Sequence, residues 1–287
     1  MKKKKRIGIF GAGQAGAMIM NWLPADNEMQ FFIDNSVKKQ GQYFCGYEIV
    51  AADIGIKANL DLIWIAVLNL EAEQAIKMQL IQLGFKGEVR TASEIKEIID
   101  LRVSALRLIA DSITKRNVSG YVAELGVFRG DFASEINRLF PERKLFLFDT
   151  FSGFDAADLK IESKVGGKSA LMDFSDTSEE LVGSRLEHPE QAVFVRGVFP
   201  KSLKSVSDSD SLRFAFVSLD PDLYEPVKKG LEYFFPRLSL GGVIMVHDYN
   251  SVQYPNVKKA VDEYCNSNGI VPIPIIDLHG SAVIVKQ

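Results

Sequence analysis

The sequence predicts an α/β protein of two Rossmann-like domains joined by a long helix. Three observations lead to this prediction. Strand and helix patterns alternate over the first 92 residues, the alternation resumes at residue 118, and an apolar stripe with helical spacing runs between the two parts. With 287 residues, 47% of them hydrophobic, the chain is long enough to bury two cores. We therefore assign residues 1–92 and 118–287 to two domains and residues 93–117 to the helix.

The first domain is expected to hold a short parallel sheet. Its predicted strands are Arg6–Phe10, Met29–Ile33 and Leu60–Val67, and the last is a near-continuous apolar run, typical of a strand buried on both faces. Helices are predicted at Gln14–Leu23 and Glu71–Leu83. This segment is expected to be too short for a full six-stranded sheet.

A glycine turn, GAGQAG, follows the first predicted strand. Glycines at Gly11, Gly13 and Gly16 allow a tight turn, close approach of a phosphate, and close helix packing. Asp34 ends the second strand, where its carboxylate could accept a hydrogen bond from a ribose hydroxyl. The pattern predicts a site for a nucleotide, NAD(P) among the candidates, with a purely structural turn as the alternative.

The predicted joining helix carries one apolar stripe, and Ser93 suits its N-terminus. The stripe consists of Ile95, Ile98, Ile99, Val103, Leu106 and Ile109. Its apolar residues could also serve a homo-oligomer.

The second domain is expected to contain five parallel strands and a terminal hairpin. The five strands are predicted at Tyr121–Leu125, Lys144–Phe148, Ala192–Val195, Phe214–Leu219 and Gly242–Val246. Helices are predicted between them and beyond, at Phe132–Phe140, Ser178–Leu186, Tyr224–Phe235 and Asn256–Asn266. The last two strands, Ile270–Ile276 and Ser281–Val285, are joined by a short turn and so must be antiparallel. This is the layout of a class I methyltransferase sheet.

A second glycine turn, ELGVFRG, follows the first strand of this domain. Gly126 and Gly130 let the backbone approach a ligand, and the helix N-terminus behind them favours a carboxylate. Glu124 could pair with an ammonium group. S-adenosylmethionine carries both groups on its methionine end, and Asp149, which ends the next strand, is placed to accept from its ribose hydroxyls. We predict a cofactor site made of Glu124, Gly126, Gly130, Asp149, Thr150 and Phe151.

Polar residues also follow the fourth and fifth strands of this domain. They are Asp220 and the pair His247-Asp248, and in open α/β sheets such strand ends converge on one crevice. A carboxylate beside a histidine can orient it as a base, and a group of carboxylates can instead bind Mg²⁺. Asp220, His247 and Asp248 are therefore the candidate catalytic residues and the candidate metal ligands.

The second half resembles the macrocin O-methyltransferase family of sugar methyltransferases. The similarity runs from about residue 118 to 268 and includes GYVAELGVFRGDFASEINRLF, LFLFDTFSGF and FVSLDPDLYEPVKKGLEYFFPRLSLGGVIMVHDYN. The resemblance implies methyl transfer from S-adenosylmethionine to a sugar hydroxyl, with Asp220 and an acidic pair after the fifth strand holding Mg²⁺. That pair is typically Asp-Asp in the family, whereas this chain has His247-Asp248. Either a different metal takes His247 as a ligand, or the metal is absent and His247 is a general base.

The first half resembles the small nucleotide-binding domain of polysaccharide-biosynthesis dehydratases and epimerases. The similarity covers about residues 6–95 and includes GAGQAG, FFIDNSVKKQGQYFCGYEIVAADI and LDLIWIAV. In such proteins the domain is an accessory one, so the resemblance implies a surface-sugar context more than a reaction.

Charge and composition exclude several classes of protein. A net charge of −3 argues against nucleic-acid binding, and no apolar stretch approaches the ~20 residues of a membrane span. The two cysteines form no CxxC pattern, and no signal-peptide layout is present, so we expect a cytoplasmic protein.

The predicted function is O-methylation of a sugar, sugar nucleotide or glycosylated metabolite in surface-polysaccharide or natural-product biosynthesis. The alternatives depend on the first domain: an NAD(P)-dependent oxidoreductase, or a non-catalytic nucleotide-sugar-binding protein.

Overall fold

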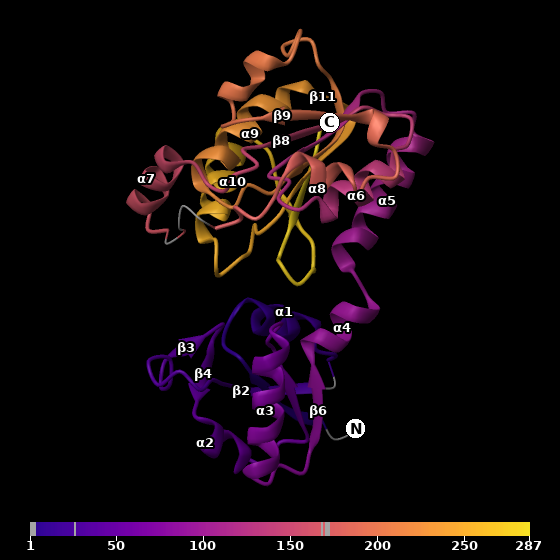
Figure 1. The fold of residues 1–287 in the computed structure, drawn as a ribbon. Coiled ribbons are helices and arrows are strands. Elements are labelled where there is room, and N and C mark those ends of the chain that lie inside the picture. Colours follow the sequence, from indigo (N-terminus) through magenta and orange to yellow (C-terminus); the bar gives the residue numbers. More distant parts are fainter. Residues whose placement is uncertain (1–3, 26, 168, 170–172) are drawn as a thin grey trace. The chain divides into compact units, whose positions relative to one another are not determined.

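The computed structural model describes residues 4–25, 27–167, 169 and 173–287. Contacts divide the chain into two compact units, each built on its own β-sheet (Figure 1). The first unit comprises Met1–Leu101 with Ile276–His279, and the second comprises Arg102–Ile275 with Gly280–Gln287. Most of the expected joining segment therefore belongs to the second unit.

The sheet of the first unit has six strands in the order β3-β4-β2-β1-β5-β6. They are β1 (Lys5–Phe10), β2 (Asn27–Ile33), β3 (Tyr43–Phe44), β4 (Tyr47–Val50), β5 (Leu62–Ile65) and β6 (Glu88–Thr91). Every neighbouring pair is parallel except β3 with β4. The expectation that this segment cannot hold six strands is wrong. Six strands fit because three of them are very short: β3 has two residues, and β4 and β6 have four each.

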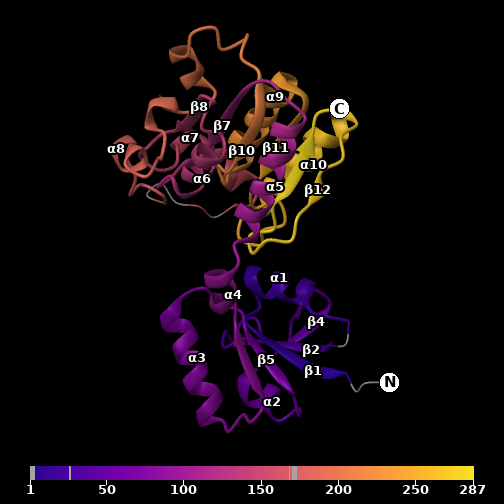
Figure 2. The ribbon, with the colours of Figure 1, turned by 90° about the vertical axis from the view of Figure 1, so that its right-hand side faces the viewer.

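Helices cover both faces of this sheet (Figure 2). They are α1 (Gln14–Trp22), α2 (Ala52–Ile56), α3 (Leu70–Gln82) and α4 (Ala92–Ile98). On one face Ile19 of α1 packs with Ile9 and Phe32, and on the other Ile76 of α3 packs with Ile63. The alternation of buried strand residues thus gives each face its own apolar core.

The expected single joining helix is instead two helices, α4 and α5 (Leu101–Lys115). Ile99 lies between them with an extended backbone (φ −136°, ψ 113°), and no glycine or proline in the segment marks the break. Thr91, not Ser93, caps α4, because its side chain and that of Glu94 form a reciprocal capping box. The break places Arg102 in the first turn of α5.

The sheet of the second unit has seven strands in the order β12-β13-β11-β10-β7-β8-β9. They are β7 (Tyr121–Leu125), β8 (Leu145–Asp149), β9 (Ala192–Arg196), β10 (Phe214–Leu219), β11 (Leu238–Val246), β12 (Ile273–Pro274) and β13 (Ala282–Val285). The first five are parallel, whereas β13 pairs antiparallel with both β11 and β12. The predicted layout of five parallel strands and a terminal hairpin is confirmed.

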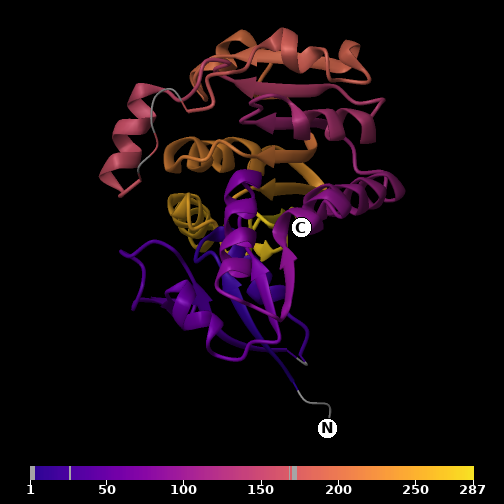
Figure 3. The ribbon, with the colours of Figure 1, turned by 60° about the horizontal axis from the view of Figure 1, so that its bottom comes forward.

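Two layers of helices enclose this sheet (Figure 3). Helices α5, α6 (Asp131–Leu139) and α8 (Glu179–Gly183) pack on one face, and α9 (Tyr224–Arg237) and α10 (Pro255–Asn268) pack on the other. α7 (Ala156–Lys164) packs against α9, and short 3₁₀ turns lie at Pro189–Gln191 and Lys201–Ser205. Within the described part of the chain, no helix is both long and apolar enough to cross a bilayer.

The strand order determines where a site can form in the second unit. β7 lies between β10 and β8, so the chain winds away from it in both directions along the sheet. Ligands of open α/β sheets bind beyond the carboxyl ends of the strands at such a reversal. The loops that follow β7, β8, β10 and β11 meet at this edge.

Candidate active site

The glycine turn after β7 packs directly against the loop after β10. Gly126 has a φ of +85°, and a Cβ added there would lie 2.2 Å from the carbonyl oxygen of Asp220. Gly130, with a φ of +80°, would place a Cβ 2.8 Å from Val182 of α8. Contacts inside the protein therefore favour glycine at both positions. This requirement is independent of any space that the glycines also leave for a ligand.

Asp149, at the end of β8, holds the glycine turn through backbone hydrogen bonds. Its Oδ2 accepts from the amides of Val127 (2.6 Å) and Phe128 (3.0 Å), and its Oδ1 accepts from the amide of Phe151 (2.8 Å). The Thr150 hydroxyl also lies 3.4 Å from Oδ1, so the carboxylate is already surrounded by donors of its own turn. Asp149 is placed beside the turn, as the sequence predicts, and it has a structural role that the prediction did not include.

Thr150 and Phe151 are engaged within the same turn. The Thr150 hydroxyl donates to the carbonyl oxygen of Gly153 at 2.5 Å. Phe151 is 4% exposed, and its ring packs against Phe194 in the core. Their contact with a cofactor stays a prediction.

Glu124, the penultimate residue of β7, is buried with one of its oxygens unpaired. Ser218 of β10 donates to Oε1 at 3.1 Å. Among the described residues, no donor lies within hydrogen-bond distance of the buried Oε2. Burial raises the pKa of Glu124 to about 8, against the opposing charge of Arg102. A buried acceptor without a partner is costly, so Oε2 is a position where a ligand donor fits.

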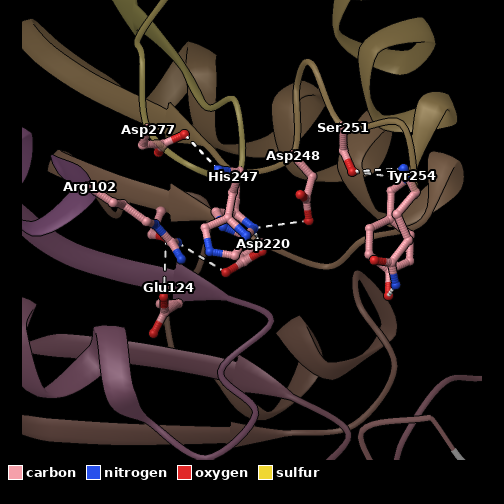
Figure 4. Close-up of polar contacts among 11 residues, drawn as sticks. Arg102, Glu124, Asp220, His247, Asp248, Ser251, Tyr254 and Asp277 are labelled. Atoms are coloured by element: carbon pink, nitrogen blue, oxygen red, sulfur yellow. Dashed lines mark hydrogen bonds and ion pairs between the residues drawn. The ribbon is translucent and has the colours of Figure 1, made fainter. Parts of the chain in front are cut away.

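Arg102 and His247 converge on Asp220 from opposite sides (Figure 4). Nη2 of Arg102 lies 3.0 Å from Oδ2 of Asp220, and Nδ1 of His247 lies 2.7 Å from Oδ1. Burial alone would raise the pKa of Asp220, but the charges of His247 and Arg102 lower it to about 2. Asp220 is therefore an ionised carboxylate with a cation on each oxygen.

His247 also approaches Asp248, whose Oδ2 lies 3.0 Å from Nδ1. Burial and Arg102 disfavour the imidazolium, but Asp220 and Asp248 outweigh them and raise the pKa of His247 to about 10. His247 is thus protonated at neutral pH. A protonated imidazole cannot take a further proton, and the role of general base considered from the sequence stays a prediction.

Asp222 joins this cluster, although the sequence prediction left it out. It has a left-handed backbone, with a φ of +58°. Burial, followed by the charges of Asp220 and Asp248, raises its pKa well above the ordinary value. A carboxylate with a raised pKa is a stronger base than a solvated one.

The cluster can be tested for the metal that the family resemblance implies. Ligand atoms of Asp220, Asp222, His247 and Asp248 all lie within 4.8 Å of one another, which is close enough to surround a cation. However, Arg102 donates to Oδ2 of Asp220, and Nδ1 of His247 lies within 3.0 Å of oxygens of two carboxylates. Mg²⁺ requires oxygen ligands and tolerates little distortion. The arrangement of these side chains therefore does not fit Mg²⁺.

The glycine turn of the first unit is a separate structure with its own constraints. Gly11, with a φ of +117°, would place a Cβ 2.8 Å from the carbonyl oxygen of Ala66, and Gly16 would place one 2.2 Å from that of Gly11. Gly13 differs, because its backbone is extended and no atom lies within 4 Å of its added Cβ. Packing explains two of the three glycines, and the space at Gly13 is open.

Asp34 holds this turn in the way that Asp149 holds the other. Its oxygens accept from the amides of Ala12 (3.1 Å) and Ser36 (2.9 Å). Lys39 also donates to Asp34, at 2.9 Å, and to the carbonyl oxygen of Ala12, at 2.9 Å. The carboxylate predicted to face a ribose is therefore already paired with a lysine of its own domain.

Three site residues escaped the sequence prediction for different reasons. Asp222 lies two residues after Asp220, in the stretch quoted for the family resemblance, so its spacing from Asp220 could have included it. Ser218 is a single polar residue in the otherwise apolar strand β10, so the sequence pattern gave no reason to select it. Arg102 gave no signal, since it is 118 residues from Asp220 in a helix taken as a linker.

The sheet order and the strand-end cluster define a protein of the class I methyltransferase fold. A model of the family described as Macrocin-O-methyltransferase (TylF) matches residues 90–287, so the chain belongs to that family, as the sequence resemblance predicted. A second model, described as C2185-like, N-terminal, matches residues 3–89. A distinct N-terminal domain thus precedes the family region.

Known relatives are O-methyltransferases. The chain is 28% identical to the demethyldecarbamoylnovobiocin O-methyltransferase of Streptomyces niveus, over 57% of this chain, and spans 64% of that relative's length. It is 26% identical to the 8-demethyl-8-(2,3-dimethoxy-alpha-L-rhamnosyl)-tetracenomycin-C 4'-O-methyltransferase of Streptomyces olivaceus, over 65% of this chain and 73% of that one. The solved structure of the O-methyltransferase NovP aligns with a TM-score of 0.51 and 26% identity, over 65% of this chain and 79% of that one.

Proposed function

We propose that this chain is an S-adenosylmethionine-dependent O-methyltransferase that methylates a hydroxyl of a sugar, a sugar nucleotide or a glycosylated metabolite. The observation that carries the proposal is the buried Oε2 of Glu124, which has no partner in the described part of the chain and lies one strand away from the carboxylates Asp220 and Asp222. A cationic donor and a proton-releasing hydroxyl can therefore be bound side by side at one edge of the sheet.

The cofactor position follows from the residues around the turn after β7. Oε2 of Glu124 suits the ammonium group of S-adenosylmethionine, which needs an acceptor in this dry site. Asp149 is proposed to accept from a ribose hydroxyl, while its contacts with the amides of Val127, Phe128 and Phe151 keep the turn in place. When bound, S-adenosylmethionine supplies an activated methyl group on its sulfonium.

The chain's own contribution to the reaction is alignment and removal of one proton. We propose that Asp222 accepts the proton of the acceptor hydroxyl, because it lies within the cluster and its ionised form, with a raised pKa, is a stronger base than a solvated carboxylate. Asp220 and Asp248 fix His247, and Asp248 contributes to the raised pKa of Asp222. This role for Asp222 replaces the role first considered for His247.

The sugar acceptor is proposed from the relatives. One is named for methylation of novobiocin's precursor, and another for the 4' hydroxyl of a rhamnosyl group. Both names are those of natural products, and the second carries a rhamnosyl sugar, so among the two settings considered, natural-product biosynthesis is favoured over surface-polysaccharide biosynthesis.

The N-terminal unit supports an accessory role in this proposal. The open space at Gly13 is compatible with a bound phosphate, but Asp34 is already paired with Lys39. We therefore do not carry forward the oxidoreductase alternative, and we propose that this unit binds a nucleotide or serves only as structure.

The test is methyl transfer by the full chain. Purified protein with isotopically labelled S-adenosylmethionine is assayed against a panel of sugar nucleotides and glycosides, and products are identified by mass spectrometry. We expect transfer to a hydroxyl oxygen of at least one glycosylated compound. Transfer only to nitrogen or carbon acceptors, or NAD(P)-dependent oxidation with no cofactor binding in the second unit, would overturn the proposal.

A further inference from the structure

The strand-end cluster already contains a guanidinium and an imidazole among its carboxylates. Arg102 lies 3.0 Å from one oxygen of Asp220, and His247 lies 2.7 Å from the other. Both side chains are largely buried, with 14% of Arg102 and 11% of His247 exposed. The charge of the carboxylates is thus balanced from within the protein, in a place shielded from solvent.

The contacts of His247 fix where its proton sits. Nδ1 lies within 3.0 Å of oxygens of both Asp220 and Asp248. A lone pair this close to two anionic oxygens would be repelled, so this nitrogen carries the proton. With its proton on Nδ1, His247 has no lone pair on the nitrogen that faces Asp220 and Asp248 to offer a metal ion.

Arg102 is held rigidly beside the same carboxylates. Its guanidinium lies 3.7 Å from the centre of the Phe132 ring and also donates to Ser218 at 3.4 Å. A guanidinium remains charged at every pH relevant to enzymes. A divalent ion at Asp220 would therefore lie against a fixed positive charge or would have to displace it, and at this separation like charges repel strongly.

We propose that Arg102 and His247 take the place of a divalent cation in this chain, so that methyl transfer at this site requires no metal. The chemistry of this inference rests on the proposed function. The acceptor oxygen forms its bond to the methyl carbon, the carbon–sulfur bond breaks with its electron pair left on sulfur, and the hydroxyl proton passes to Asp222. The two cations stabilise the negative charge that develops on the acceptor oxygen.

The experiment measures metal binding directly, without cofactor or acceptor. The full chain is titrated with Mn²⁺, and free Mn²⁺ is followed by electron paramagnetic resonance, for the wild type and for His247→Asp, Arg102→Gln and the double variant. We expect no Mn²⁺ uptake by the wild type up to millimolar concentrations. We expect His247→Asp to tighten Mn²⁺ binding by about tenfold or more, because changing a residue at a metal site commonly alters the metal affinity by 10- to 100-fold. The double variant should bind Mn²⁺ most tightly. Methyl transfer by the wild type should be unchanged by EDTA.

Two results would overturn the proposal. One is uptake of one Mn²⁺ by the wild type with a micromolar Kd that Asp220→Asn abolishes. The other is no gain in Mn²⁺ affinity in either single variant or the double variant, with circular dichroism showing that they are folded. If the variants do not fold, the wild-type titration and the EDTA assay still decide the question. Failure of the proposed function would appear separately, as absence of S-adenosylmethionine binding in metal-free calorimetry.

Discussion

The hydroxyl of Ser218 donates a 3.1 Å hydrogen bond to Oε1 of Glu124, from one strand to its neighbour at the centre of the sheet. This bond fixes the carboxyl group and leaves Oε2 buried without a partner among the described residues. Glu124 of the glycine motif is therefore held in an orientation in which Oε2 can accept a hydrogen bond from a ligand. The cofactor end of the proposed site depends on this arrangement.

The affinity for S-adenosylmethionine should rise with pH up to about 8 and level off above it. Burial raises the pKa of Glu124 to about 8, so the neutral acid dominates below that pH, whereas only the carboxylate pairs with an ammonium. If only the ionised form binds, the apparent Kd falls by up to about tenfold per pH unit below the pKa. Calorimetry across this pH range measures the effect, with Glu124→Gln as the control that should lack it. An affinity that falls with rising pH would contradict the prediction.

Substitution by alanine should destabilise the protein at the tightly packed Gly126 but not at Gly13, where the space is open. Gly126→Ala places a Cβ 2.2 Å from the Asp220 carbonyl oxygen at a φ of +85°, so we expect a loss of about 1–3 kcal/mol of stability and impaired methyl transfer. Gly13→Ala meets no atom within 4 Å and should leave stability unchanged. Thermal unfolding of both variants tests this. A wild-type midpoint for Gly126→Ala would show that the packing argument is wrong.

Removing the carboxylate of Asp149 should loosen the turn that it holds. Asp149→Ala leaves the amides of Val127, Phe128 and Phe151 without their acceptor, at a cost of about 1–3 kcal/mol for each buried donor left unpaired. Amide hydrogen exchange at these positions should accelerate, and Asp149→Asn, which keeps one oxygen, should show a smaller effect. Unchanged exchange in the alanine variant would refute the structural role.

Asp222→Asn should slow methyl transfer while sparing cofactor binding. Loss of the proton acceptor is expected to lower kcat by about 10²–10⁴-fold, with the Kd for S-adenosylmethionine unchanged. Asp111→Asn, on the exposed side of α5, is the matched control and should keep the wild-type rate. Single-turnover kinetics with an accepted sugar would reveal the difference, and a wild-type rate in Asp222→Asn would remove this residue from the chemistry.

Hydrophobic periodicity predicted the second sheet well. Tyr121–Leu125 and Phe214–Leu219 have the bounds that the sequence predicts, because central parallel strands are uniformly apolar and end at polar loops. The short strands β3, β4 and β6 were missed, since two to four residues carry no measurable period. The break before α5 was also missed, because the apolar stripe continues through it.

The charges of the site were harder to predict than its position. Strand ends located Asp220, His247 and Asp248, but the protonation of His247 depends on distances to two carboxylates that no spacing reveals. Arg102 reaches the cluster only because the break at Ile99 starts a helix there. In the first unit, Lys39 neutralises Asp34 through a turn whose geometry the motif did not specify.

The central claim is that the second glycine turn, not the first, holds S-adenosylmethionine. Calorimetry of the full chain with S-adenosylmethionine and S-adenosylhomocysteine tests it, using Glu124→Gln and a carboxylate-to-amide change beside the other glycine turn, Asp34→Asn. We expect micromolar binding by the wild type and by Asp34→Asn, and binding weaker by about 10- to 100-fold in Glu124→Gln, as loss of a hydrogen bond to a charged group costs about 1.5–3 kcal/mol. No binding by the wild type, or loss of binding in Asp34→Asn with Glu124→Gln unaffected, would contradict the account.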